Sequence, residues 1–455
     1  MGLTTPCNEY NKFSTAWRKT RDVVEGVLTV KGAKETYLPK GRMSPTDYAD
    51  YLERAEFVGY VDKIIDYSAG QLLRNPPAIK GVPDDIITDF DLCGNSITSV
   101  IDHISRELMT VERVGIWFDY SEDQKRPYAV IVKTENIIKW NYGYVNGTKT
   151  LKSIVLALEE EKLNPVTFDT ERNPTWVCLY INEDGVFQKD TYTNKSGKSG
   201  ELELSESVVP VAGIGGKPLD FIPFAIVPAK GTPEHIHTAA MYPVAEVNLS
   251  LYRSMASREQ LLFYYGMPTG IAIGWDQDTF PIGGVAKFPT GGDFKFAQIE
   301  VDDAVVKAIQ DKKEEIAQLG SSFLSGRGRY VASAQTSENN QQGDYASLSS
   351  IANAISRALT DILRDMSVYG HDGLEKDASV TVNTEFEEPE FTPGELTELG
   401  AEVAAGRLSW DAYFHNCQKN KLYPNGWTKE QEFEAIKTTS QMIASARTQI
   451  PGFTF

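Results

Sequence analysis

The cluster Glu234, His235 and His237 is the strongest candidate in the sequence for metal chemistry. In an extended segment, alternate residues point to the same side, so these two imidazoles can bind one zinc ion with a carboxylate beside them. No third ligand is indicated, and Gly231-Thr232-Pro233 directly before the cluster is typical of an exposed linker. We therefore predict no metal and no cofactor, and we keep a metal-dependent hydrolase built on these three residues as an alternative.

A second candidate is the glycine-rich run Gly213-Ile214-Gly215-Gly216-Lys217, which looks like a nucleotide-binding phosphate loop. That motif needs a glycine at the position of Val211 and a Ser or Thr at the position of Pro218, so the run does not fit it. Nucleophile-elbow, HExxH and protein-kinase motifs are also absent from the sequence. The sequence therefore indicates a protein that is not an enzyme.

Arg327 and Arg329 form the one local basic feature whose setting suits phosphate. Flanking glycines let the backbone approach a ligand, and the guanidinium fork matches phosphate oxygens. Equally, two arginines at the end of a helix can stabilise the negative end of the helix dipole. The polar stretch 330–343 that follows is predicted to be a loop. Its polar residues of interest are Gln335, Asn339, Asn340, Gln341 and Gln342.

Three lysines, Lys307, Lys312 and Lys313, precede this region on a predicted helix. Acidic residues at positions 311, 314 and 315 balance them, which is typical of a solvated helix face. If the helix lines a channel, these lysines are the candidate charges on its channel face.

The composition limits the class of protein. The chain has 455 residues, with 45 Lys and Arg against 63 Asp and Glu, so its net charge is 45 − 63 = −18. A chain this acidic repels a phosphate backbone, which excludes a tight nucleic-acid binder. The N-terminal sequence has no apolar core of a secretory signal, and no stretch is long and apolar enough to span a membrane. We expect a protein of the cytosol, or of a particle assembled there, whose four scattered cysteines are free thiols.

The elements of the first half indicate an α+β lobe. After a polar N-terminal arm, Ser44 as N-cap and Pro45 predict one helix over 44–73, and an amphipathic stretch predicts another over 97–109. Short apolar runs separated by turns predict strands over 114–118, 128–132, 137–140, 154–158 and 176–181. Their spacing fits an antiparallel meander.

The second half is mainly helical. Apolar residues at helical spacing predict helices over 243–265, 300–325 and 348–366, with a small block of strand character over 269–299 between the first two. A strand over 378–386 and three short helices, which start at Thr392, Ser409 and Thr428, follow. Long helices on either side of a short β block must return antiparallel, so the block lies at the tip of a stalk. Such a stalk exposes helix faces that need partners, and symmetric copies are the usual ones.

Short signatures are dispersed over the chain from about Tyr37 to about Glu434. In the first half they are Tyr37-Leu38-Pro39, Asp47-Tyr48, Arg54-Ala55, Phe57, Leu72-Leu73-Arg74-Asn75-Pro76-Pro77, Arg113-Val114-Gly115-Ile116, Arg126-Pro127-Tyr128 and Glu135-Asn136-Ile137-Ile138-Lys139-Trp140. In the second half they are Pro243, Ala245-Glu246-Val247-Asn248-Leu249, Tyr252-Arg253, Gly266-Met267-Pro268-Thr269, Leu319-Gly320, Pro393-Gly394-Glu395-Leu396 and Ala405-Gly406-Arg407-Leu408-Ser409. With them the chain resembles the bacteriophage portal proteins, or head-to-tail connectors, of the compact subgroup found in short-tailed and related phages.

The resemblance implies an α+β portal fold with an α/β wing, a two-helix stem, a small clip that contains β structure, and a short helical crown. The expected parts are an N-terminal arm (1–35), the first part of the wing (36–238), stem helix 1 (239–266), the clip (267–300), stem helix 2 (301–325), the tunnel loop (326–345), the wing helix and strand (346–390) and the crown (391–455). The arm matches nothing in the family, and we expect it to lie against a neighbouring subunit.

The resemblance also implies a ring, usually of twelve copies, at one vertex of the virion capsid, assembled in the host cytoplasm. Such a ring passes double-stranded DNA without sequence specificity during packaging and ejection. Its expected partners are terminase, a tail or neck adaptor and the major capsid protein, and no membrane. Arg327, Arg329 and the polar loop would approach the DNA. The expected clip contacts with the motor or adaptor are Trp275, Asp276, Gln277, Asp278 and Phe280. Another neck or capsid protein of the virion stays an alternative.

Overall fold

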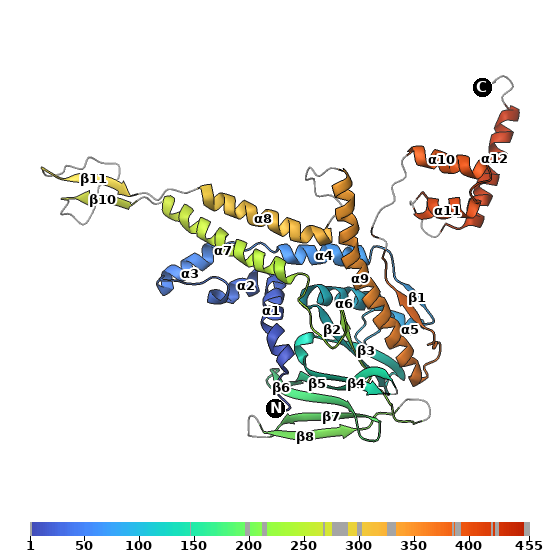
Figure 1. Cartoon of the computed structure of the whole chain (residues 1–455), viewed down its shortest axis with the longest axis horizontal. Coiled ribbons are helices and arrows are strands. Elements are labelled where there is room, and N and C mark those ends of the chain that lie inside the picture. Colours follow the sequence, from blue (N-terminus) through green and yellow to red (C-terminus); the bar gives the residue numbers. More distant parts are fainter. Residues whose placement is uncertain are drawn as a thin grey trace. The chain divides into compact units, whose positions relative to one another are not determined.

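The computed structural model describes residues 2–145, 147–195, 201–211, 216–266, 269–274, 290–297, 303–324, 334–384, 386, 393–419, 422–423 and 427–449. The chain divides into two compact units, Met1–Thr384 and Glu385–Phe455. Both helices and sheets contribute, so the fold is of the α+β class that the sequence predicts (Figure 1).

The elements follow in chain order. The helices are α1 (Asn8–Glu25), α2 (Val27–Gly32), α3 (Pro45–Arg54), α4 (Tyr60–Leu72), α5 (Asp84–Thr88), α6 (Ile97–Val111), α7 (Tyr242–Tyr265), α8 (Asp303–Leu324), α9 (Ala334–Met366), α10 (Pro393–Ala404), α11 (Trp410–Lys419) and α12 (Lys429–Gln449). The strands are β1 (Ala78–Lys80), β2 (Arg113–Ser121), β3 (Arg126–Val132), β4 (Ile137–Val145), β5 (Thr148–Leu163), β6 (Thr170–Ile181), β7 (Phe187–Asn194), β8 (Leu202–Val208), β9 (Phe224–Pro228), β10 (Thr269–Ile273), β11 (Asp293–Ala297) and β12 (Ser379–Thr381). None of the helices in the described ranges is long and apolar enough to cross a lipid bilayer.

The predicted strands form two larger sheets instead of one meander. Strands β4 to β8 pair in sequence order and are antiparallel throughout, as the turn spacing predicts. Strands β2 and β3 belong to a separate sheet of order β3-β2-β9. Strand β9 follows β8 in the chain but pairs with β2, so it closes this sheet by a long-range contact. Local spacing cannot reveal such a pairing.

The core of the first unit lies where α6 and α9 meet the β3-β2-β9 sheet. Helix α6 contacts both β2 and α9, and α9 also contacts β9. Helix α6 buries Ile97, Ile101 and Ile104 completely, and α9 does the same with Ile355 and Leu359. The apolar stripe predicted over 348–366 is therefore confirmed as the buried face of α9.

The N-terminal region is helical and packs on its own chain. In α1, Trp17 and Val23 are buried, and Arg21 forms ion pairs with Glu107 of α6 and Glu135, at 2.9 and 2.6 Å. Lys19 pairs with Glu246 of α7. The N-terminal region is therefore a helical part of the first unit, and its contact with a neighbouring subunit stays a prediction. Two cations of α1, Lys19 and Arg21, thus meet carboxylates of the same chain.

The single helix predicted over 44–73 is two helices, because the chain breaks between α3 and α4. Ser44 caps α3 through the N–H of Asp47, as predicted. At the break, the side chain of Asn248 accepts the backbone N–H of Tyr60 at 3.1 Å and donates to the carbonyl of Val58 at 3.0 Å. Asn248 is only 1% exposed. A buried amide from α7 thus holds the bend by replacing the hydrogen bonds that a continuous helix would make.

Among its described residues the second unit has the helices α10, α11 and α12, and the predicted start signals of α11 and α12 are seen, whereas Thr392 lies outside the described residues. Thr428 Oγ1 accepts the N–H of Gln431, and the Gln431 side chain accepts the N–H of Thr428, which is a complete capping box before α12. Ser409 accepts the N–H of Ala412 in the same way before α11.

Replacing Asn248 by alanine tests the role of the bend. We expect Asn248→Ala to lower the free energy of unfolding by about 2–3 kcal/mol, because it leaves a buried N–H and a buried C=O without partners. Urea unfolding followed by tryptophan fluorescence measures this loss. The matched control is Asn353→Ala, an exposed asparagine on α9, which should change stability by less than about 0.5 kcal/mol. Equal losses in the two variants would contradict this account of the bend.

Candidate functional site

The helical pair α7 and α8 is held against the first unit along only part of its length. Helix α7 contacts α1, α3, α4 and α8, and the described residues that it buries lie between Val244 and Ala256. Helix α8 buries Ile309 and Ile316, seven residues apart, while Val306 is 49% exposed. The two helices run antiparallel side by side, and β10 and β11 follow beyond their ends (Figure 1). The long helices and the strand block predicted here are confirmed as elements.

The end of α7 is apolar and exposed around the whole helix. Leu262, Phe263, Tyr264 and Tyr265 are 38–48% exposed. Arg54 of α3 stacks on Phe263 at 4.1 Å, but this leaves much of the turn uncovered. Four large apolar residues in succession cannot share one buried stripe, since successive residues on a helix are about 100° apart. The turn is therefore built to be covered from several sides.

The three candidate lysines of α8 do not share a face. Lys307 and Lys313 are exposed, whereas Lys312 is half-buried and donates to Ser254 Oγ and, at 3.4 Å, to the carbonyl of Ser250, both on α7. Positions 307, 312 and 313 are spread around the helix at about 100° per residue. Lys312 therefore joins the two helices, and the assignment of the three lysines to a channel face stays a prediction.

The predicted polar loop is also wrong from Ala334 onward, where α9 begins. Gln335, Asn339, Asn340, Gln341 and Gln342 lie in this helix. The reason is that extending an existing helix adds one hydrogen bond for each residue fixed, and no proline interrupts the segment. Arg327 and Arg329 lie outside the described residues. So do the predicted clip residues Trp275, Asp276, Gln277, Asp278 and Phe280.

A long hairpin extends from the five-stranded sheet. Strand β5 pairs with β4 only up to Leu156, and β6 pairs with β7 only from Thr175, yet β5 and β6 continue to pair out to Leu163 and Thr170. The five outermost residue pairs thus have no neighbouring strand and extend about 17 Å beyond the sheet. Apolar side chains gather at the tip. Leu163, Val166 and Phe168 are 62%, 84% and 76% exposed.

The Glu234, His235 and His237 cluster does not converge on one point. Glu234 pairs with Lys149 at 2.6 Å, and the exposed side chain of His235 lies 3.8 Å from Glu9. The ring of His237 lies against Gly231, where an added Cβ would come within 2.6 Å of Nε2. In the described parts of the chain, no group of three His, Cys, Asp or Glu side chains could hold a metal ion. The four cysteines are free thiols.

A buried ionisable pair, Glu112 and Arg113, lies where α6 meets β2. Glu112 adopts a positive φ of 78°, which is rare outside glycine, and is 1% exposed. Its carboxyl accepts the backbone N–H of His237 at 3.2 Å. Burial raises its pKa to about 7, although hydrogen bonds from backbone N–H groups and the charge of Arg113 act in the opposite direction. Glu112 therefore anchors the segment that carries the histidines.

Arg113 is completely buried and stacks on Trp140 at 4.0 Å. Its Nε donates to Thr134 at 3.0 Å, while Nη1 and Nη2 have no partner among the described residues. Burial lowers its pKa to about 10. An adjacent acid and base buried between a helix and a strand explain why the segment keeps one conformation.

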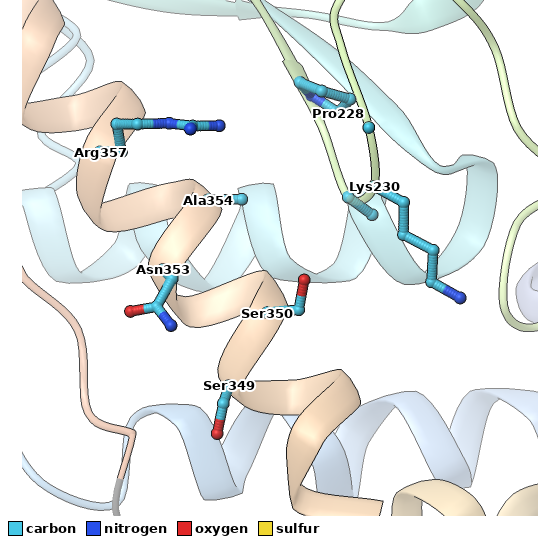
Figure 2. A pocket seen from close by; sticks show the side chains of 9 residues that line it. Pro228, Lys230, Ser349, Ser350, Asn353, Ala354 and Arg357 are labelled. Atoms are coloured by element: carbon cyan, nitrogen blue, oxygen red, sulfur yellow. The ribbon is translucent and has the colours of Figure 1, made fainter.

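A hollow of about 580 Å³ lies next to this segment, between the end of β9 and the middle of α9. One wall is Pro228 to Gly231, and the other is one face of α9 (Figure 2). The α9 residues that line it are Ser349, Ser350, Asn353, Ala354 and Arg357. Its lining contains two cations, two hydroxyls and an amide but no carboxylate.

Sequence reasoning did not single out the hollow, the Glu112–Arg113 pair or the hairpin tip as functional features. Lys230 and Arg357 come from distant segments, so no spacing relates them. Glu112 and Arg113 did carry a signal, since they are charged residues within the apolar run from Leu108 to Phe118. Such a pair is expected to be buried, because the apolar residues on both sides of it are buried and the pair lies between them.

Comparison with known proteins gives a partial family match. Residues 240–369, which span α7 to the end of α9, match the model of a family described as a domain of unknown function (DUF4055). No curated protein matches the chain. The chain is similar to one in the neck of an empty gene transfer agent (GTA) particle computed with C6 symmetry, with 12% identity, a TM-score of 0.43, and coverage of 84% of this chain and 95% of that chain.

Two further solved structures are similar to it. One is a chain of the virion of a native GTA particle, with 12% identity, a TM-score of 0.41, and coverage of 84% of this chain and 96% of that one. The other is a chain of the neck of a native GTA particle computed with C12 symmetry, with 11% identity, a TM-score of 0.40, and coverage of 87% and 98%.

The Glu112 carboxyl makes stability depend on pH in a defined direction. Its pKa is about 7 in the folded chain against 4.5 as the reference, so folding favours the protonated form. This contribution is fully present below pH 4.5 and is lost as the pH rises to 7, by at most about 3 kcal/mol. We expect Glu112→Gln, which cannot ionise, to be more stable than the parent at pH 8 and similar to it at pH 4.5. Urea unfolding at both values measures the difference.

Glu122→Gln is the control for this experiment, since Glu122 is exposed in the turn between β2 and β3. It should show the pH dependence of the parent chain. A Glu112→Gln variant whose stability differs from the parent by the same amount at both pH values would show that the carboxyl does not titrate as inferred.

Proposed function

We propose that this chain is the subunit of a phage-type portal, a head-to-tail connector that forms a ring, of twelve copies, at one capsid vertex. The observation that carries the proposal is the antiparallel α7–α8 pair with β10 and β11 beyond its ends. Such a pair, anchored along one part and exposed elsewhere, suits a stem whose free faces meet those of neighbouring copies. The segment 267–300 would then be the clip and the second unit the crown.

The exposed apolar surfaces support a ring. The end of α7 and the tip of the β5–β6 hairpin are different surfaces, and neither is self-covered. When one surface of a subunit binds a different surface of the next, the contact repeats and closes into a ring if the rotation allows it. A five-pair hairpin without neighbouring strands is also marginal alone in water. A neighbouring copy would cover its tip.

The net charge supports a conduit more than a DNA clamp. Twelve copies at −18 each would carry 12 × −18 = −216. Strong phosphate contacts would slow a sliding duplex, whereas an acidic wall repels it and leaves it free to move. Arg327 and Arg329 would be the residues that approach the DNA. We expect the chain to have no catalytic turnover of its own, with the packaging ATPase in the terminase.

The partners of such a ring are terminase and a tail or neck adaptor, which would dock on the clip through Trp275, Asp276, Gln277, Asp278 and Phe280, and the major capsid protein around the vertex. Another neck protein of a virion is the competing candidate, because the exposed surfaces would also serve a ring that stacks below a portal. The two differ in whether the ring alone binds terminase.

Electron microscopy of the purified full-length chain tests the proposal directly. We expect rings with a central opening wide enough for a DNA duplex, because the stem would line the bore. Monomers or dimers without an opening at micromolar concentration would overturn the proposal. Rings that bind the adaptor but not terminase would favour the neck protein.

A second prediction concerns the hairpin tip. We expect Phe168→Asp to raise the concentration needed for ring formation at least tenfold, because it puts a charge into the surface that the neighbouring copy covers. Phe168 has a positive φ of 58°, a conformation that aspartate tolerates, so folding should be preserved. Sedimentation velocity measures the assembly.

Tyr144→Asp is the matched control, because Tyr144 is 73% exposed beside the β4–β5 turn, at the opposite end of β5 from the tip. It should leave assembly unchanged. If both variants weaken assembly equally, the tip has no special role in the contact.

A further inference from the structure

We propose that the hollow between β9 and α9 binds a ligand that carries linked phosphate groups. Neither the family match nor the proposed ring assigns a role to this hollow. The inference depends on the hollow alone and not on ring formation. The first argument is its size: about 580 Å³ is large enough for a small organic anion or a segment of a polymer.

The second argument is the chemistry of the lining. The side chains that can donate hydrogen bonds are those of Lys230, Ser349, Ser350, Asn353 and Arg357. A single carboxylate offers two acceptor oxygens, whereas two linked phosphate groups offer at least four non-bridging oxygens, which suits this larger set of donors. The lining includes no acidic side chain, although the whole chain has a net charge of −18. The hollow is thus a positive site on an acidic protein.

The third argument is that both cations are available. Among the residues that the structure describes, no ion pair within 4 Å and no side-chain hydrogen bond joins Lys230 or Arg357 to a partner, although the charge of Lys230 acts at longer range on the buried Glu112 carboxyl. Elsewhere in the same unit, cations such as Arg21 and Arg126 lie against carboxylates at 2.6–2.9 Å. Lys230 and Arg357 at the hollow therefore differ from Arg21 and Arg126, whose charges form ion pairs within the fold.

The arrangement favours an extended ligand over a single ion. In Figure 2, the Arg357 side chain reaches from α9 toward Pro228, whereas the Lys230 ammonium extends away on the other side of Ser350. The two cations thus come from the two walls of the hollow, Lys230 from the segment after β9 and Arg357 from α9. The successive phosphates of a polynucleotide strand and those of a free polyphosphate both carry several charges, which two cations on separate walls can bind. The experiment must therefore distinguish these two sources.

The experiment measures binding of two probes to the full-length chain. The first probe is a fluorescein-labelled duplex DNA of about 20 base pairs, followed by anisotropy over a series of salt concentrations. The second is tripolyphosphate, followed by calorimetry and by competition against the DNA. The test variant is Lys230→Ala with Arg357→Ala, and its folding is checked by its thermal unfolding curve.

The control variant is Lys429→Ala with Arg407→Ala, in the second unit. These two cations are of the same types, but they already have carboxylate partners, Asp411 at 2.6 Å and Glu402 at 2.7 Å. Both double variants change the net charge from −18 to 43 − 63 = −20. Long-range repulsion of the probe is therefore equal in the two, and a difference between them reports the hollow itself.

We expect the test variant to bind at least one probe ten times more weakly than the parent, and the control variant to stay within about twofold. If the source is nucleic acid, the slope of log affinity against log salt should fall by about 1.8, which is 0.9 for each lost phosphate contact. If the source is a free polyphosphate, tripolyphosphate affinity should fall while DNA binding is weak in all variants. Equal binding of both probes by the two variants would overturn the proposal, whatever the outcome of ring formation.

Discussion

The burial of the first half of α7 is the interaction on which the other helices depend. This half contacts α1, α3, α4 and α8, so it is the common support of the N-terminal helices and the stalk. Polar contacts fix the direction of each neighbour: Lys19 of α1 pairs with Glu246, Asn248 holds the α3–α4 bend, and Lys312 of α8 reaches Ser254. Apolar contacts alone would let the helices shift along one another. These hydrogen bonds and ion pairs join specific atoms, so they fix the relative positions of the helices. The second half of α7 keeps a hydrogen bond from Arg54 to Gln260 at 2.8 Å and the stacking of Arg54 on Phe263, but among the described residues it buries none beyond Ala256.

The distribution of cations explains how an acidic chain can still contain a positive site. Several arginines of the first unit have internal roles: Arg21 joins two carboxylates, Arg126 pairs with Asp89, and Arg113 is buried against Trp140. Charges in such pairs are neutralised and contribute little to the field outside. The remaining surface is mostly acidic, so an unpaired cation near a concave wall creates a local potential of opposite sign. Net charge therefore limits how strongly the whole chain can bind a polyanion, but it does not decide what one hollow binds.

Local sequence signals predicted an element well where nearby residues alone determine it. The capping box at Thr428 and Gln431, the N-cap Ser44 and the apolar stripe of α9 depend only on nearby residues. The errors arose where distant residues decide. The break before α4 needs the amide of Asn248, almost two hundred residues away, and the β2–β9 pairing joins strands from far apart. The candidate site followed the same rule: the hollow unites Lys230 and Arg357, and no spacing in the sequence relates them.

The surfaces proposed for assembly lie on elements whose inner ends are rigid, and this has a physical consequence. The β5–β6 hairpin continues two central strands of the five-stranded sheet. Its base is therefore held in place by strand pairing with β4 on one side and β7 on the other. The apolar turn of α7 likewise continues a helix whose buried residues extend to Ala256. A rigidly held apolar tip loses little conformational entropy when a partner covers it, so more of the buried area contributes to affinity. Because the two tips are different surfaces, covering each one with the other side of a neighbouring copy gives a contact that repeats in one direction. A closed ring satisfies every copy in such a series, whereas any open arrangement leaves one apolar surface exposed at each end.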